Sequence, residues 1–211
     1  MPLYSVLVAC DSKYYNDWGI TLLNSIKYHN PWLNLRCHIV NPNNNNKLNF
    51  VTYTEEQISF TNDITRIAYL QAARFIAVSK IPLNENLITL DADTICTRSF
   101  SQQDFSTLFK KQYVMQHPKE PRWLAGLVTF GSNNFRYRYA ELLNSKNIKD
   151  WEWGRDQEVM PQLAKEFNFN PVDKKWIAIG KNKSNSAFLT LKGEQKETDK
   201  YLNVYKGYLK C

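Results

Sequence analysis

The sequence predicts an α/β fold with a mostly parallel central sheet, and three observations lead to this prediction. Residues 3–9 are almost continuously apolar, as strands of a parallel sheet are when both of their faces are buried. An amphipathic helix is expected at about residues 16–28, and Pro31 ends it. A second strand is expected at residues 35–40. A strand–helix–strand order of this kind is typical of a parallel sheet covered by helices.

The composition is that of an ordinary globular domain. The 211 residues include 43% apolar and 22% charged residues, with a high aromatic share of 14%. No stretch approaches the roughly 20 apolar residues that span a bilayer, and the first residues carry no signal-peptide pattern. We therefore expect a cytoplasmic protein, and we expect its widely spaced cysteines to be free thiols: Cys10, Cys37, Cys96 and Cys211.

A long helix is expected at about residues 62–79, after a short third strand at residues 49–54. Thr61 or Asn62 suits its N-cap. Arg74 has a planar guanidinium group that suits a phosphate or an acidic side chain, whereas Arg66 is expected to be mainly solvated. The predicted buried stripe of this helix, which excludes both arginines, comprises Ile64, Ile67, Ala68, Phe75 and Val78.

Two acids separated by one alanine follow the next strand, at residues 87–90. In an extended chain, residues two apart point to the same side, so Asp91 and Asp93 are expected to aim both carboxylates at one point. Neighbouring carboxylates repel each other and usually need a cation between them. Mg²⁺ or Mn²⁺ suits these hard oxygen ligands and keeps positions open for phosphates. A solvated turn is the alternative interpretation.

Asp11 and Tyr14 follow the end of the first strand. Ligands of parallel α/β sheets bind beyond the carboxyl ends of the strands, so these residues are expected to share one crevice with the two acids. Tyr14 could stack on a ligand in this crevice, or it could equally well pack against the edge of the sheet.

The second half of the chain is expected to add a short helix from Ser101 and strands at residues 113–116 and 123–130. Gly126, in the last of these strands, permits the close approach of the backbone to a ligand. His117 lies in the Pro-rich loop between the strands and is left out of the metal site, because a lone loop histidine is usually solvated.

A second polar cluster lies further along the chain. Trp151 and Trp153 offer apolar platforms for a sugar ring, and Asp156 and Gln157 offer hydrogen-bonding groups for its hydroxyls. The alternative is a helix start with Asp156 as the N-cap, although Pro161 would distort a helix that begins there.

The C-terminal segment carries most of the positive charge. Residues 171–211 include nine lysines and four acids, so five of the seven net positive charges lie there. Such a segment suits a diphosphate, an anionic lipid surface or nucleic acid. The pattern of residues 198–210 predicts an amphipathic helix that packs on the domain, with peripheral membrane contact as the alternative.

The helix that carries Arg74, followed by the strand end Leu90-Asp91-Ala92-Asp93-Thr94, resembles glycosyltransferases of the GT-A fold. The group most like it contains glycogenin and the bacterial galactosyltransferases, and the likeness runs in order from Leu3 to about Lys196. It implies a Rossmann-like nucleotide-diphospho-sugar transferase fold in a single domain. The expected divisions are a nucleotide-binding half at 1–100, a donor-sugar and acceptor half at 101–196, and a basic C-terminal helix at 197–211.

The resemblance also implies roles for individual residues. In the family, an acid and a tyrosine after the first strand hold the nucleotide base, and Asp11 and Tyr14 match those positions. The family's Asp-Gln pair, near the donor sugar and the acceptor, matches Asp156 and Gln157. An Ala-Gly strand lines the donor sugar, and Leu124 stands there in place of a common asparagine.

Near the C-terminus, Gly193 and Lys196 keep the spacing of a His-x-x-Gly-x-x-Lys motif, and Thr190 stands in place of its metal-binding histidine. Lys192 and Lys196 are the expected counter-charges for a leaving diphosphate. The candidate residues are Asp156 and Gln157 for catalysis, Asp91 and Asp93 for a metal ion, and, for the nucleotide sugar, Ala9, Asp11, Tyr14, Arg74, Asp91, Ala92, Gly126, Lys192, Gly193 and Lys196.

The expected function is therefore the transfer of a sugar from a nucleotide sugar, a UDP-sugar by resemblance, to a hydroxyl of a glycan or another acceptor. Mn²⁺ or Mg²⁺ is the expected cofactor, and no nucleic-acid partner is expected. The closest resemblance implies retention of the anomeric configuration, whereas Asp156 could serve as the base of an inverting enzyme. A nucleotidyltransferase of related fold and a basic nucleic-acid-binding protein remain alternatives, although no Gly-rich phosphate loop follows the first strand.

Overall fold

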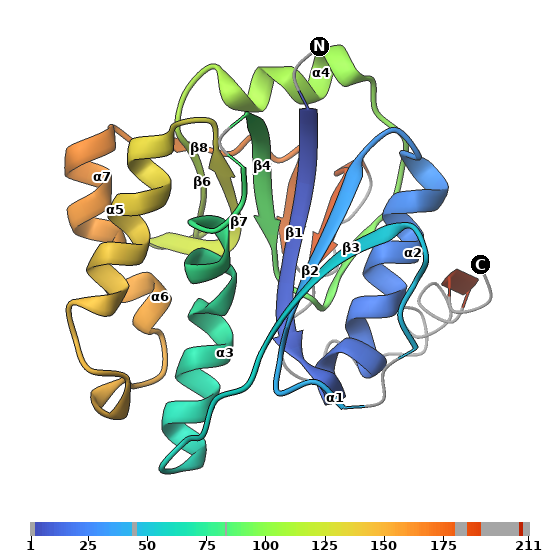
Figure 1. Cartoon of the computed structure of the whole chain (residues 1–211). Coiled ribbons are helices and arrows are strands. Elements are labelled where there is room, and N and C mark those ends of the chain that lie inside the picture. Colours follow the sequence, from blue (N-terminus) through green and yellow to red (C-terminus); the bar gives the residue numbers. More distant parts are fainter. Residues whose placement is uncertain (1–2, 44–45, 83, 180–184, 191–206, 209–211) are drawn as a thin grey trace.

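The computed structural model describes residues 3–43, 46–82, 84–179, 185–190 and 207–208. Its main sheet has seven strands in the order β3-β2-β1-β4-β7-β6-β8 (Figure 1). Within the sheet as described, β7 runs antiparallel to β4 and β6, and the other strands share one direction. The predicted mostly parallel sheet is thus confirmed. Its strands are β1 (Leu3–Asp11), β2 (Asn34–Val40), β3 (Val51–Glu56), β4 (Glu85–Leu90), β6 (Tyr113–Gln116), β7 (Trp123–Phe130) and β8 (Asn170–Pro171).

A smaller sheet in the order β5-β10-β9 lies against the main one. Its strands are β5 (Thr94–Cys96), β9 (Ile177–Ile179) and β10 (Phe188–Thr190). The helices are α1 (Ser12–Tyr14), α2 (Ile20–His29), α3 (Asp63–Val78), α4 (Gln102–Ser106), α5 (Asn133–Asn144), α6 (Arg155–Glu158) and α7 (Met160–Phe167), with a π-helical turn at Tyr15–Gly19 and 3-10 turns at Thr107–Phe109 and Ile148–Asp150.

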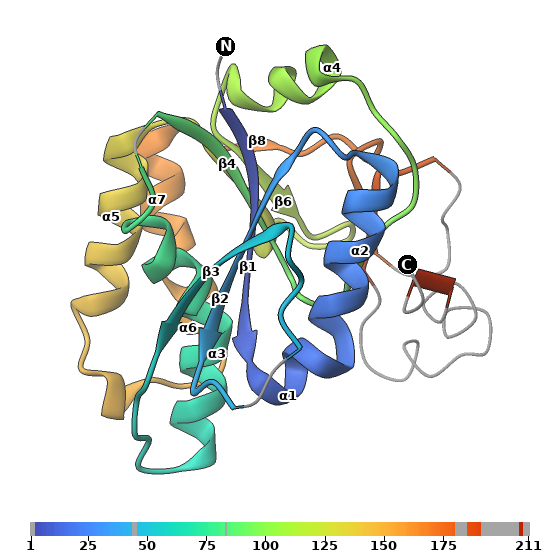
Figure 2. The same cartoon turned by 45° about the vertical axis from the view of Figure 1, so that its right-hand side comes forward.

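The main sheet is buried on both faces. Alternate residues of β1 divide between two cores: Val6 and Val8 pack on the side of α2 and the small sheet, and Leu7 and Ala9 pack on the side of α3, α5 and α7. Figure 1 and Figure 2 show α2 on one side of the sheet and α3 with α5 on the other. The sequence of β1 is almost continuously apolar because both faces of this strand are buried.

Helix α3 begins after the predicted N-cap Asn62, whose side chain accepts a hydrogen bond of 2.8 Å from the Thr65 amide. The predicted buried stripe is wrong at Ile64 and Ile67, which are 63% and 42% exposed. The helix instead packs through a surface rich in alanine, whose buried residues are Thr65, Ala68, Tyr69, Ala72, Ala73, Arg74, Phe75, Ala77 and Val78. Small side chains let the helix lie close to the sheet, and the two exposed isoleucines lie near the N-terminal end of the helix.

The region of the two acids also differs from the prediction. Strand β4 ends at Leu90, and the Thr94 amide donates a hydrogen bond of 3.1 Å to the Asp91 carbonyl. Asp91 and Asp93 therefore lie in a turn between β4 and β5 and not in one extended strand. The expectation that residues two apart point to the same side holds only for an extended chain and does not apply to this turn. The directions of the two carboxylates are therefore set by the residues that they contact.

Cys10, Cys37 and Cys96 are buried free thiols, as predicted, and Cys211 lies outside the described residues. Burial raises the pKa of the Cys96 thiol to about 12, which makes it unreactive at neutral pH. No helix in the described part of the chain combines the length and the apolar character that a bilayer crossing requires.

The predicted C-terminal helix is described only at Gly207 and Tyr208, which are helical. Tyr208 lies on α2: its hydroxyl is 2.7 Å from Nε2 of His29, and its carbonyl accepts a hydrogen bond of 3.0 Å from the Asn24 amide. This residue thus packs on the domain. Lys192, Gly193 and Lys196 lie outside the described residues.

Candidate active site

The loops after β1 and β4 meet at one edge of the main sheet. The Tyr14 hydroxyl donates a hydrogen bond of 2.8 Å to Oδ2 of Asp93. The ring of Tyr14 also lies 6.4 Å from that of Trp18, centre to centre. The structure therefore brings together two segments that the sequence predicted to share a crevice. The proposed contact of Tyr14 with a nucleotide base stays a prediction.

Asp11 is held at the start of α1. Its Oδ1 atom accepts a hydrogen bond of 2.8 Å from the Tyr14 amide, and its Oδ2 atom forms an ion pair of 3.1 Å with Arg66. Arg66 was expected to be mainly solvated, but its side chain is only 39% exposed and binds this site residue. The arginine fixes the loop after β1 against α3.

Arg74 lies at the centre of the site, with 5% of its surface exposed. One terminal nitrogen is 2.8 Å from Oδ1 of Asp91, and the other is 3.5 Å from Oδ2 of Asp156. The second nitrogen also donates a hydrogen bond of 3.1 Å to the Ala125 carbonyl. The acid of the motif was one predicted partner of Arg74; Asp156 and Ala125 were not predicted. One side chain thus joins α3, the β4–β5 turn, β7 and α6.

Asp156 is 2% exposed and lies inside α6. The residue before this helix is Gly154, whose φ of 85° favours glycine, so the alternative of Asp156 as the N-cap is wrong. The Tyr139 hydroxyl donates a hydrogen bond of 2.6 Å to the Asp156 carbonyl. Burial, and then the nearby Asp156 carboxylate, raise the pKa of Tyr139 well above its usual value, so the phenol remains a donor. As expected, the helix is interrupted before Pro161, and α7 begins anew at Met160.

The two tryptophans have different environments. Trp151 is 1% exposed, stacks on Tyr69 with ring centres 5.7 Å apart, and donates a hydrogen bond of 2.9 Å from its indole to the Lys146 carbonyl. It is therefore a core residue, and the prediction of a sugar platform there is wrong. Trp153 is 68% exposed and keeps an accessible ring. Gln157 is half-buried and faces a pocket described below.

Gly126 places β7 directly against the motif. A Cβ atom at this position would lie 2.8 Å from Sδ of Met115 and 3.3 Å from Oδ2 of Asp91. The approach of a ligand to this glycine stays a prediction, and the neighbours that the structure places there are the acid of the motif and a buried methionine. Ala9 and Ala92 are each 5% exposed and pack in the two cores, so only their backbone groups are left for a ligand.

Replacing Gly126 with alanine should displace Met115 and the Asp91 carboxylate. We expect Gly126→Ala to lower the free energy of unfolding by about 1–3 kcal/mol, as overpacking of a buried site does. Urea denaturation followed by tryptophan fluorescence measures this loss. Gly131→Ala is the matched control, because its new Cβ would meet atoms only at 3.5 Å or more. Equal stability of the two variants would contradict the close approach at Gly126.

The donor set fits a hard divalent cation in part. Asp91 and Asp93 supply carboxylate oxygens, which suit Mn²⁺ or Mg²⁺. Among the described residues, no group of three or more His, Cys, Asp or Glu side chains could hold a metal ion. Thr190 is fully buried in β10 and pairs with Thr94, one residue after Asp93. The residue that stands in place of the histidine of the resembled motif therefore lies beside the two acids.

No protein-family model and no curated protein matches the sequence. Solved structures match the fold. The glycosyltransferase GlyE of Streptococcus pneumoniae TIGR4 has a TM-score of 0.65 and 14% identity, over 97% of this chain and 60% of its own. The galactosyltransferase LgtC, in complex with donor and acceptor sugar analogs, has a TM-score of 0.63 and 12% identity, over 96% of this chain and 95% of its own. The bifunctional glycosyltransferase WbbM has a TM-score of 0.65 and 11% identity, over 99% of this chain and 49% of its own.

These similarities establish the fold: the chain has the GT-A architecture that the sequence predicted. It spans most of LgtC, but only 60% of GlyE and about half of WbbM. At identities of 11–14%, activity does not follow from the fold alone.

Proposed function

We propose that this chain transfers a sugar from a nucleotide sugar, a UDP-sugar by resemblance, to an acceptor hydroxyl. The observation that carries the proposal is the bridge made by Arg74 between Asp91 of the Asp-x-Asp turn and the buried Asp156. On a GT-A fold, this bridge ties the acid expected near the diphosphate to the acid expected near the sugar. The similarity to several glycosyltransferases supports the same reaction class.

Asp91 and Asp93 would hold Mn²⁺ or Mg²⁺, which would supply positive charge to the diphosphate as it leaves. Arg74 adds a second fixed positive charge beside Asp91. Its planar guanidinium also holds the Asp91 carboxylate in one orientation, and the Tyr14 hydroxyl does the same for Asp93. The two carboxylates are therefore held in fixed orientations before substrate binds. Such preorganisation favours electrostatic stabilisation of a leaving group.

Asp156 and Gln157 would position the donor sugar and the acceptor hydroxyl. Asp156 is held by Arg74 through its side chain and by Tyr139 through its backbone, so its carboxylate has a fixed direction. Asp11 and Tyr14 would hold the base of the nucleotide at the other side of the Asp-x-Asp turn.

Calorimetric titration with UDP tests the nucleotide and metal parts of the proposal. We expect binding that strengthens at least about tenfold with Mn²⁺ and weakens again with EDTA, because two carboxylates alone repel a diphosphate. A screen of UDP-, GDP- and CMP-sugars for donor hydrolysis identifies the donor. Equal UDP affinity with and without metal would remove the metal role from Asp91 and Asp93.

A further inference from the structure

Two neighbouring pockets run along α7. The first, of about 490 Å³, reaches from Gln157 past Pro161 to Ala164. The second, of about 600 Å³, continues from Ala164 to Gln112 and Asn168. Trp123 and Ala164 line both pockets, so the two are adjacent, and together we call them the α7 groove.

The helix itself explains the shape of the α7 groove. Pro161 and Ala164 are three residues apart and therefore lie on one side of α7, and Asn168 follows the helix as its C-cap, with a φ of 48°. Leu163 packs in the core, where it is fully buried, and Met160, which is 1% exposed, packs there too and also lines the first pocket. Ala164, which lines both pockets, has a small side chain.

The lining of the α7 groove combines an aromatic ring with amide groups. Trp123 is half-buried and is held edge-to-face by Phe169, with ring centres 5.4 Å apart and planes at 83°. Gln157, Gln112 and Asn168 supply amides along its length. A fixed aromatic face suits the apolar side of a sugar ring, and amides both donate to and accept from its hydroxyls. Charged side chains (Lys111, Arg122 and Glu158) also line the groove, but they carry both signs and favour no strongly ionic ligand.

We propose that the α7 groove binds an oligosaccharide, namely the acceptor residues beyond the one that receives the new sugar. This inference rests on the proposed transferase function, because Gln157 belongs both to the groove and to the proposed acceptor position. The groove would make the enzyme prefer an acceptor of several sugar residues over a single sugar.

Nuclear magnetic resonance of the ¹⁵N-labelled protein tests binding without requiring activity. The probes are glucose-, galactose- and N-acetylglucosamine-based oligosaccharides of one to five residues. We expect the indole N–H signal of Trp123, identified from its loss in Trp123→Phe, to shift with the longer members of one series and not with the single sugar. If no oligosaccharide shifts this signal, the proposal is overturned.

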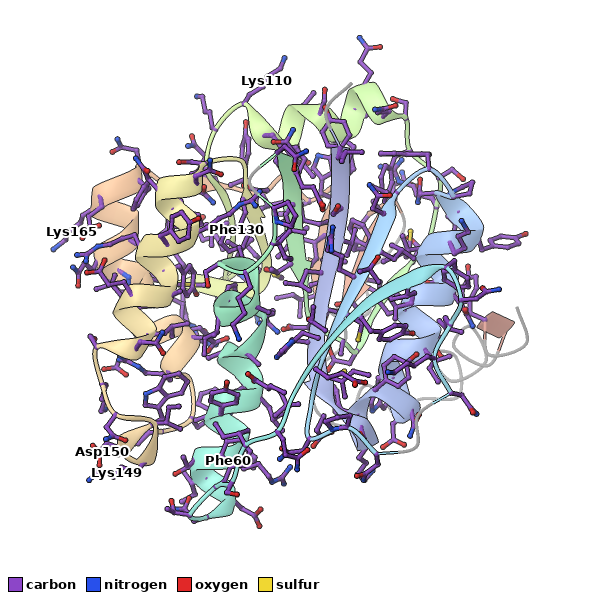
Figure 3. All side chains as sticks on the ribbon, in the orientation of Figure 1. Phe60, Lys110, Phe130, Lys149, Asp150 and Lys165 are labelled. Carbon is purple, nitrogen blue, oxygen red and sulfur yellow. The ribbon has the colours of Figure 1, made fainter. Side chains whose placement is uncertain are left out.

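Ala164→Trp fills the centre of the groove, and Lys165→Trp is its control. Lys165 is the next residue of the same helix, is exposed and projects away from the sheet (Figure 3). Oligosaccharide affinity should fall at least about tenfold in Ala164→Trp and change less than about twofold in Lys165→Trp. Ala164→Leu provides a smaller obstruction should the tryptophan variant lose its fold, as judged by thermal unfolding. Equal affinities in the folded groove variant and the control would place the ligand elsewhere.

Donor hydrolysis separates the two proposals. It should be unchanged in Ala164→Trp, while transfer to the longer acceptor falls and transfer to a single sugar remains. If the protein binds oligosaccharides but turns over no nucleotide sugar, the proposed glycan site is supported and the proposed transferase function is contradicted. If it turns over the donor but the Trp123 signal does not respond to oligosaccharides, the transferase function is supported and the role of the α7 groove is contradicted. A concentration-dependent dimer that is lost in Ala164→Trp would instead assign the groove to a second copy of the chain.

Discussion

Asp93→Asn is expected to lose both metal-dependent UDP binding and sugar transfer, whereas Asp156→Asn is expected to lose transfer alone. An amide is a poor ligand for a hard cation, so Asp93→Asn should remove the gain in affinity that Mn²⁺ provides. Asp156 lies in α6, and Arg74 separates it from Asp91 of the Asp-x-Asp turn. Replacing Asp156 should therefore leave the gain in UDP affinity with Mn²⁺ unchanged. Calorimetry with UDP measures the first property, and release of UDP from the donor measures the second.

We expect turnover of Asp156→Asn to fall by about 10²-fold or more, with UDP affinity within a few-fold of the parent. Asparagine preserves the size and most hydrogen bonds of the side chain, so a loss of this kind would mean an interaction made mainly in the transition state. Asp150→Asn is a suitable control, because Asp150 is an exposed acid in the 3-10 turn shortly before this helix. If Asp156→Asn turns over like the parent, Asp156 has no catalytic role, and Glu152 or Glu158 becomes the next acid to test.

Arg74→Met is expected to destabilise the fold by about 3–5 kcal/mol, which is the usual cost of removing one partner of a buried ion pair. The substitution keeps an unbranched apolar chain but removes the cation beside Asp91 and Asp156. It also removes the hydrogen bond to the Ala125 carbonyl. Urea denaturation gives the change in the free energy of unfolding, and this result does not depend on the proposed reaction.

The double variant Arg74→Met/Asp156→Asn separates charge from packing. If the buried carboxylate is the main cost, neutralising it should recover about 1–2 kcal/mol of the loss, seen as a coupling free energy in the double-mutant cycle. Arg66→Met is the control, because its pair with Asp11 is 39% exposed on the arginine side and should contribute no more than about 1 kcal/mol. Additive effects of the two changes at Arg74 and Asp156 would show that the 3.5 Å contact between them is energetically unimportant.

Much of the fold was predictable because its signals are local. The apolar run of β1, the N-cap at Asn62 and the acids after β4 can each be recognised within a few residues of sequence. The meeting of Tyr14 with Asp93 then follows from a general rule, since parallel strands end at the same edge of a sheet.

Other features were not predictable from local patterns. The contact between Arg74 and Asp156 joins residues 82 positions apart, and no periodicity marks it. Hydrophobicity alone assigned Ile64 and Ile67 to the core, whereas the helix packs through smaller alanines that approach the sheet more closely. Trp151 was predicted to be a sugar platform because it lies near Asp156 and Gln157 in the sequence, yet it stacks in the core on Tyr69, which is distant in sequence.

The pairing of β10 with β5 determines when the site can be completed as the chain is synthesised. Thr190 pairs with Thr94, so the strand that braces the turn after Asp93 leaves the ribosome only after almost the whole second half of the chain. Closing the loop between such distant segments costs entropy, and non-local contacts of this kind slow folding. A growing chain therefore contains its first four parallel strands before β10 is available to pair beside the Asp-x-Asp turn.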